Sequence, residues 1–110
     1  MLVLLDSGTP RGLARFLTSH SVEEARARGW EEFANGELID AAEQAGFDVL
    51  VTTDKNIHYQ QNLKARTIAL VVLEHSQWPM VKLVAEKIVA AVNSALPGSY
   101  VEVEVPFKDA

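Results

Sequence analysis

The chain contains no cysteine, and its 110 residues include no long apolar run. Without cysteine it can form no disulfide, thiol nucleophile or thiolate metal site, so any metal must be held by oxygen or imidazole ligands. No apolar stretch approaches the roughly 18 residues of a membrane span, and the N-terminal MLVLLD lacks the basic start and cleavage site of a signal peptide. We therefore expect a soluble, cytoplasmic protein with no membrane partner.

Basic residues are also scarce, since 10 Lys and Arg against 15 Asp and Glu give a formal net charge of -5. This balance argues against a general nucleic-acid binder, whose affinity for phosphates comes from clustered Lys and Arg. Eight of the 15 acidic residues lie between Glu23 and Asp48, however, and residues 7–22 and 55–73 contain basic residues but no acidic ones. The two acid-free stretches predict a locally positive rim on an otherwise acidic protein.

The pattern of apolar residues predicts one α/β domain over residues 1–110, with no repeat or linker. Three apolar runs read as buried parallel strands, at residues 2–5, 49–53 and 68–73. Tyr100 to Val105 alternates apolar and acidic residues, which is typical of a half-exposed edge strand. Strands alternating with helices in so short a chain favour a three-layer α/β/α sandwich around a mainly parallel sheet.

Capping signals predict the first two helices. Thr9 is expected to be the N-cap of a helix that has Pro10 at its first position. Residues 21–24, Ser-Val-Glu-Glu, have the spacing of a capping box and predict a short second helix that Gly29 ends.

Two further helices follow from apolar spacing and from Gly and Pro signals. A third helix is expected to open at Asn35 and to end at Gly46. The longest helix is expected to start at Pro79 and to continue to the Pro97-Gly98 break. Residues 55–62 read as a polar loop with one or two helical turns.

Two aspartates, Asp6 and Asp54, each follow an apolar run directly. Because the carboxyl ends of parallel strands meet at one edge of a sheet, we expect both carboxylates at the edge where open α/β sheets place their chemistry. With Glu37 as a possible third carboxylate, they indicate a divalent-metal site and phosphodiester chemistry.

Four segments carry a resemblance to a known family. They are LLDSGTPRGLARFL at the start, NGELIDAAEQAGFDVLVTTDKN in the middle, then YQQNL, and QWP before the last helix. Together they resemble the PIN-like domains, especially small stand-alone bacterial proteins related to VapC-type toxins, from Leu2 to about Pro106. In PIN domains an acidic residue opens a helix, a glycine ends it, and the next strand runs into a Thr-x-Asp-like motif. Asn35, Gly46 and Thr52-Thr53-Asp54 occupy those places here.

The resemblance implies a ribonuclease that depends on one or two Mg²⁺ or Mn²⁺ ions. On this interpretation Asp6, Glu37 and Asp54 are the catalytic residues. Asp6 and Asp54 ligate the metal, Glu37 ligates it or holds a water as base, and the neutral oxygens of Asn35 and Asn56 orient waters. The substrate phosphates are contacted by a basic or polar set: Arg11, Lys55, Asn56 and His58.

The sequence also departs from the PIN pattern. Asn35 stands where the helix-opening acid is expected, and Ser7 stands where many small relatives carry Glu. Fewer carboxylates weaken divalent-ion affinity, and Glu37, two positions beyond Asn35, is a candidate to restore the charge.

Each acidic candidate also has a purely structural interpretation. Asp54 and Asn35 can be helix N-caps, each contributing about 1 kcal/mol. Glu37 in the first turn of a helix is favoured by the helix dipole without any metal. Asp6 is harder to explain in this way, because Thr9 is available as the cap of the helix that follows.

Three functions from different classes remain open. The first is a metal-dependent endoribonuclease acting on single-stranded RNA, as the toxin of a toxin-antitoxin pair held by a small antitoxin protein. The second is a PIN-like module that has lost catalysis and binds RNA or protein partners. The third is a phosphotransfer enzyme with Asp6 as nucleophile, since D-x-G-T is loosely similar to the start of haloacid dehalogenases, although Gly8 stands where those enzymes need a second Asp. The acidic strand at residues 100–105 offers an edge for a homodimer, or carries its glutamates to prevent one.

Overall fold

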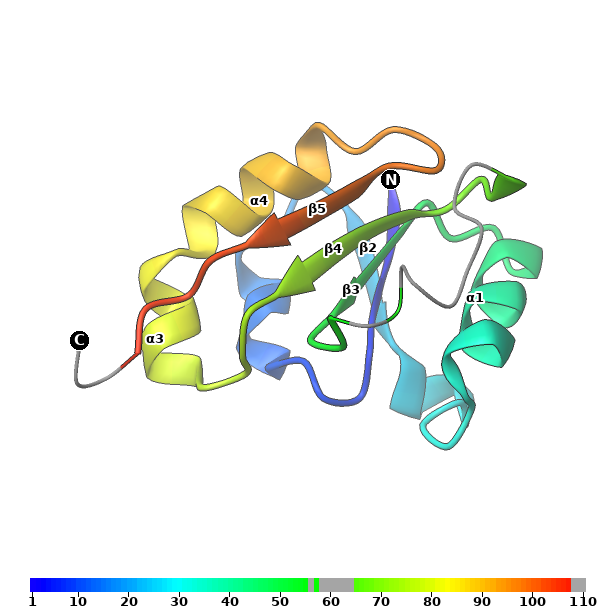
Figure 1. Ribbon diagram of the computed structural model, residues 1–110, viewed down its shortest axis with the longest axis horizontal. Coiled ribbons are helices and arrows are strands. Elements are labelled where there is room, and N and C mark those ends of the chain that lie inside the picture. The colour runs from blue at the N-terminus through cyan, green and yellow to red at the C-terminus, as the bar shows by residue number, and fades with distance from the viewer. Residues whose placement is uncertain (56, 58–64, 108–110) are drawn as a thin grey trace.

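The protein is built on one five-stranded sheet in which every strand pairs in parallel, in the order β2-β1-β3-β4-β5 (Figure 1). This computed structural model describes residues 1–55, 57 and 65–107. The strands are β1 (Leu2–Leu5), β2 (Ser21–Glu24), β3 (Val49–Thr52), β4 (Ala69–Leu73) and β5 (Tyr100–Val103).

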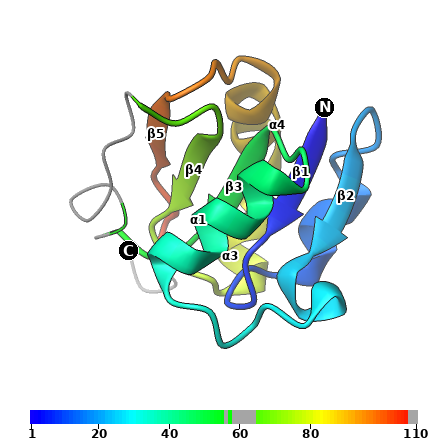
Figure 2. The same cartoon turned by 90° about the vertical axis from the view of Figure 1, so that its right-hand side faces the viewer.

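Helices cover both faces of the sheet, with α1 on one side and α3 and α4 on the other (Figure 2). The helical elements are the 3₁₀ helices η1 (Arg11–Arg15) and η2 (Ala25–Arg28) and the α-helices α1 (Asn35–Gln44), α3 (Trp78–Leu83) and α4 (Ala85–Asn93). The fold is therefore the expected three-layer α/β/α sandwich. No helix among the described residues is long and apolar enough to cross a membrane.

The two faces of the sheet form two hydrophobic cores, because successive strand residues point in opposite directions. Val49 and Val51 of β3 pack in the core that α3 and α4 cover, whereas Leu50 packs in the core beneath α1. Every residue of β3 and β4 is buried. This double-sided burial explains why these strands are continuous apolar runs in the sequence.

The strands expected from the three apolar runs and from the alternating segment at residues 100–105 are confirmed, with ends that differ by one or two residues. The helix expected to open at Asn35 is confirmed as α1. It ends before Gly46, whose φ of 87° is a left-handed conformation that suits glycine.

The second helix was expected to start with the capping box at residues 21–24, and this start was wrong. Ser21–Glu24 forms β2, which pairs in parallel with β1 so that Leu2 lies opposite Ser21 and Leu5 opposite Glu24. The capping-box spacing is only a local signal, and it is outweighed by the pairing of these residues with the otherwise open edge of β1. The short helix begins after the strand, as η2, and Gly29 with φ 77° ends it as expected.

The long helix expected from Pro79 is divided in two. It begins at Trp78, and Val84 separates α3 from α4 with φ −112° and ψ 17°. The Trp78 ring lies against Gly12 of η1, where an added Cβ would come within 2.4 Å of the ring. Trp78 is therefore a packing residue, and Gly12 allows η1 and α3 to approach closely.

A polar network ties the end of α1 to the start of β4. Glu43 accepts hydrogen bonds from the Arg66 guanidinium at 2.7 Å and from the Thr67 backbone N–H at 2.6 Å, and Arg66 also pairs with Asp40. Burial raises the pKa of Glu43, but the hydrogen bonds from Arg66, Thr67 and Ile68 outweigh it and lower the pKa below the ordinary 4.5. The ionised form of Glu43 therefore stabilises the fold.

We predict that this network makes stability depend on pH in the acid range. Because the pKa of Glu43 is lower in the folded chain, its contribution is complete above the ordinary value of 4.5 and is lost as the pH falls through the folded value. Glu43→Gln should cost roughly 1–3 kcal/mol at pH 7 and reduce the loss of stability below pH 4.5. Urea unfolding followed by circular dichroism between pH 3 and 7 measures both effects. The same change at the exposed Glu32 is the control, and equal curves for the two variants would contradict the prediction.

Candidate functional site

Asp6 and Asp54 lie at the carboxyl edge of the two neighbouring strands β1 and β3. Asp6 follows β1 directly, and its N–H continues the ladder by donating to the Val51 carbonyl at 2.9 Å. Asp54 comes two residues after β3 ends at Thr52. Both side chains are partly buried. The structure thus brings the two aspartates to one edge, as the apolar runs predicted.

The Thr52 hydroxyl connects the two aspartates. It donates to Oδ2 of Asp6 at 2.7 Å and accepts the backbone N–H of Asp54 at 3.2 Å. The Ser7 backbone N–H donates to the other carboxylate oxygen of Asp6 at 2.8 Å. Thr52 is wholly buried, so these bonds satisfy its hydroxyl and fix the direction of the Asp6 carboxylate.

Thr52 is a site residue that the sequence alone does not reveal. In the sequence this threonine stands at the end of an apolar strand and in the Thr-Thr-Asp motif. The available signal was a hydroxyl inside a run that is buried on both faces, because such a group needs partners within the protein.

Thr9 has a different role from the predicted N-cap. No side chain caps η1, whose N-cap residue is Pro10. The Thr9 hydroxyl instead donates to the Val51 carbonyl at 3.1 Å, and its backbone N–H donates to the Asp6 carbonyl at 2.9 Å. Thr9 is buried, so it anchors the turn after Asp6 onto β3.

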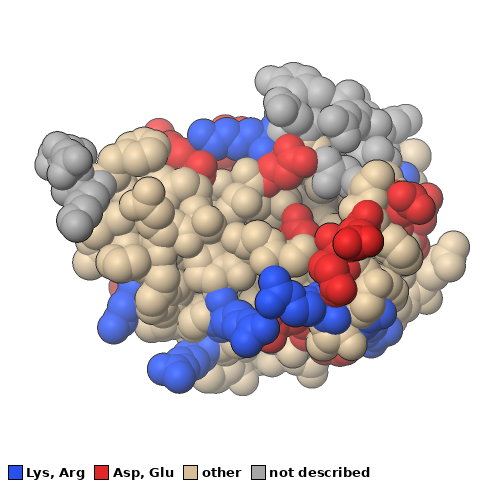
Figure 3. All heavy atoms as spheres, turned by 90° about the horizontal axis from the view of Figure 1, so that it is seen from below, with Lys and Arg blue, Asp and Glu red and all other residues tan. Residues whose placement is uncertain are grey.

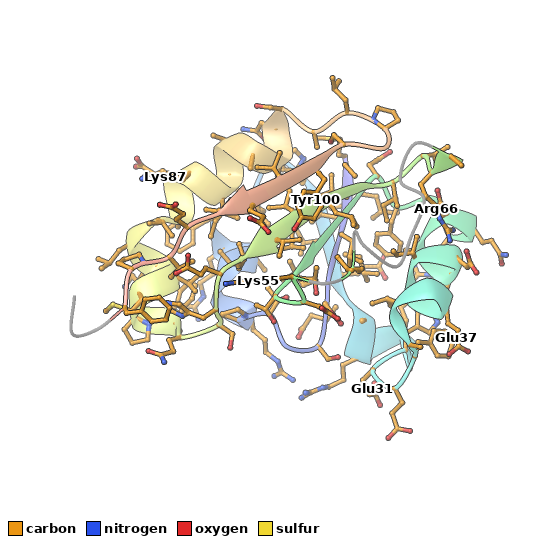
Figure 4. The ribbon with its side chains drawn as sticks, in the orientation of Figure 1. Glu31, Glu37, Lys55, Arg66, Lys87 and Tyr100 are labelled. Carbon is orange, nitrogen blue, oxygen red and sulfur yellow. The ribbon has the colours of Figure 1, made fainter. Side chains whose placement is uncertain are left out.

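Glu37 caps the helix in which it lies. Its Oε1 accepts the Ala34 backbone N–H at 3.2 Å, which is the glutamate half of a capping box. Figure 4 shows Glu37 in the first turn of α1, well apart from Lys55, the residue after Asp54. Among the described residues, no group of three or more His, Asp or Glu side chains is arranged to hold a metal ion.

Three basic residues of the two acid-free stretches lie near acidic residues from elsewhere in the chain. Arg11 pairs with Glu24 at 3.1 Å, and Arg66 joins the network at the end of α1. Lys55 lines a cavity of about 100 Å³ together with three glutamates. Figure 3, which views the molecule from below, shows acidic and basic side chains on the same face. The fold therefore offsets the charges of Arg11 and Arg66, which the sequence predicted to belong to a positive rim.

Three candidates remain sequence predictions. Asn56 and His58 lie outside the described residues, and Asn35 is the first residue of α1 but its side chain is not described. The other two histidines bond to the protein itself: His20 to Asn93 at 2.6 Å, and His75 to the Pro106 carbonyl at 2.9 Å.

No family model matches this chain, and neither do curated proteins or solved structures. The PIN-like resemblance therefore stays a prediction that rests on the four quoted segments.

We predict that Thr52→Val destabilises the protein by roughly 1–3 kcal/mol, because valine keeps the shape but removes the hydrogen bonds of the buried Thr52 hydroxyl to the Asp6 carboxylate and to the Asp54 N–H. Urea unfolding at pH 7 measures the change. Thr53→Val is the matched control, since the Thr53 hydroxyl has no hydrogen bond within the described part of the chain. A loss from Thr53→Val as large as that from Thr52→Val would refute the role of this hydroxyl.

Proposed function

We propose that the protein is a metal-dependent endoribonuclease that hydrolyses phosphodiesters in single-stranded RNA with Mg²⁺ or Mn²⁺. The observation that supports this proposal is the pair of aspartates at the carboxyl edge of β1 and β3, joined through the Thr52 hydroxyl. Open α/β sheets bind their ligands at this edge. A carboxylate that is partly exposed and held in one direction is suited to a ligand that requires fixed geometry.

The donor set fits a hard divalent cation. Asp6 and Asp54 offer only oxygen, which is the ligand that Mg²⁺ and Mn²⁺ prefer. Each carboxylate oxygen can accept two bonds, so Oδ2 of Asp6, which accepts one from Thr52, keeps capacity for a further partner. When bound, the ion would supply Lewis-acid activation of a water and offset the negative charge of the phosphate.

The remaining residues would position and neutralise the substrate. Thr52 holds the Asp6 carboxylate in place. Lys55 follows Asp54 and is exposed, so its ammonium can approach a phosphate at the same edge. Arg11 is exposed beside Glu24 and would have to leave that ion pair to contact RNA, at a cost of about 1 kcal/mol or less. Asn35, Asn56 and His58 belong to the proposal through the family resemblance alone.

The biological role that we propose is the toxin of a toxin-antitoxin pair, which rests on the resemblance to small VapC-related proteins. A PIN-like module that binds RNA or protein without cleavage is the second candidate. The position of Glu37 supports this second candidate. Glu37 was expected to supply a third carboxylate to the metal site, but its carboxylate caps α1 instead.

We predict that the purified protein cleaves a labelled single-stranded RNA with Mn²⁺ or Mg²⁺ and not with chelator. Asp6→Asn and Asp54→Asn should each abolish cleavage, because an amide oxygen is a much weaker ligand than a carboxylate. Thr52→Val should reduce cleavage by about 10- to 100-fold, as is typical when a group that orients a ligand is removed.

Glu86→Gln is the control, since Glu86 is exposed and lies in helix α4 rather than in a segment that follows a strand. Circular dichroism verifies that each variant is folded. Cleavage that persists in Asp54→Asn would exclude this site, and no cleavage by folded wild-type protein would favour the binding module.

A further inference from the structure

Strand β5 forms one edge of the sheet, because it pairs with β4 alone (Figure 1). Leu70 donates its N–H to the Ser99 carbonyl at 2.9 Å, and Glu74 donates to the Val103 carbonyl at 3.2 Å. Since successive residues of a strand direct their backbone groups to opposite sides, the N–H and C=O of Glu102 point away from β4. These groups are a template for another strand, and no proline interrupts β5.

A groove of about 490 Å³ runs beside this edge, between β5 and α4. Figure 4 shows Lys87 of α4 next to β5. The α4 side of the groove is lined by Lys87 and by the small residues Ala90, Ala91 and Ser94, and its other side by the exposed Val101, by Val103, and by Glu102 and Glu104. Alternate side chains of a strand added to β5 would therefore enter a shallow groove whose wall on the α4 side includes three small residues.

The opposite face of β5 is acidic. Glu102 and Glu104 are exposed, and neither forms an ion pair with any residue that the structure describes. The other edge strand, β2, differs in this respect. Its Glu23 pairs with Arg28 at 2.9 Å, and its Glu24 pairs with Arg11 at 3.1 Å. Glu102 accepts a hydrogen bond from the Tyr100 hydroxyl at 2.7 Å, but its charge, like that of Glu104 directly after β5, is not neutralised by an ion pair within the described residues and can attract cations of a partner.

The charge pattern disfavours a second copy of the chain as the occupant. Two copies related by a twofold axis would pair their β5 strands in antiparallel fashion, with both rows of glutamates on the same face. Like charges opposite one another in a sheet are destabilising. A segment with Lys or Arg at alternate positions would instead place a cation beside each glutamate.

We propose that β5 accepts an extended segment of another protein as an added strand, with Lys or Arg at alternate positions and small apolar residues between them. The cations would contact Glu102 and Glu104, and the apolar residues would enter the groove beside α4. This binding does not depend on the proposed nuclease activity, because it uses neither Asp6 nor Asp54.

The test uses the full chain and a fluorescent peptide of alternating Val and Lys, with an alternating Val and Glu peptide for comparison. We expect fluorescence anisotropy to detect binding of the Val-Lys peptide and not of the Val-Glu peptide. Changing both Glu102→Lys and Glu104→Lys should weaken binding of the Val-Lys peptide by about tenfold or more and permit binding of the Val-Glu peptide.

Matched controls separate strand addition from general attraction between charges. Glu31→Lys with Glu32→Lys makes the same change of net charge in the loop that follows β2 and η2, and β2 lies at the opposite edge of the sheet from β5, so this variant should leave most of the binding intact. Val-Lys peptides methylated on alternate backbone nitrogens should bind when the methyl groups face away from β5 and fail to bind when they face it. Asp54→Asn should bind like the wild type, which separates this proposal from the nuclease.

Three results would overturn the proposal. They are no binding of the Val-Lys peptide, equal binding of the two methylated forms, and self-association through β5, measured by light scattering, that the peptide does not reverse.

Discussion

Burial of the central strands on both faces is the constraint on which the rest of the structure depends. All residues of β3 and β4 are buried, and β1 has one partly buried residue followed by three buried ones. Charged groups are excluded from such strands, because an ionised side chain cannot be desolvated without a partner. The carboxylates that follow the strands therefore emerge together at the sheet edge. Thr9 and Thr52 are the only polar residues classed as buried in the described part of the chain, and both bond across to groups at that edge.

The features predicted correctly from sequence are those with a local cause. A continuous apolar run such as residues 69–73 has few stable environments other than a strand covered on both sides. Gly46 ends α1 because its φ of 87° is strained for other residues. The alternation at residues 100–105 reflects a strand that is half exposed, and β5 is indeed at the edge. In each case the physical reason acts within a few residues of the chain.

The features that were missed arise from contacts between distant segments. Ser21–Glu24 has the local pattern of a helix start, yet becomes a strand because the outer side of β1 needs a partner. Arg11 looked like part of a basic rim because its acidic partner, Glu24, lies 13 residues further along the chain. Nothing in the spacing of Thr52 reveals that its hydroxyl will bridge Asp6 and Asp54, since that depends on the register of β1 against β3.

Lys55 adjoins both proposed surfaces. It follows Asp54 in the chain, and it lines a small cavity with Glu74, Glu102 and Glu104. Those glutamates attract its ammonium group and so compete with any phosphate at the neighbouring sheet edge. A cationic segment on β5 would offset the negative charges of Glu102 and Glu104. In physiological salt, charges influence one another over roughly 8 Å. The segment would thereby release Lys55 toward the phosphate, and because such coupling is reciprocal, RNA at the edge would strengthen binding of the segment to the same extent.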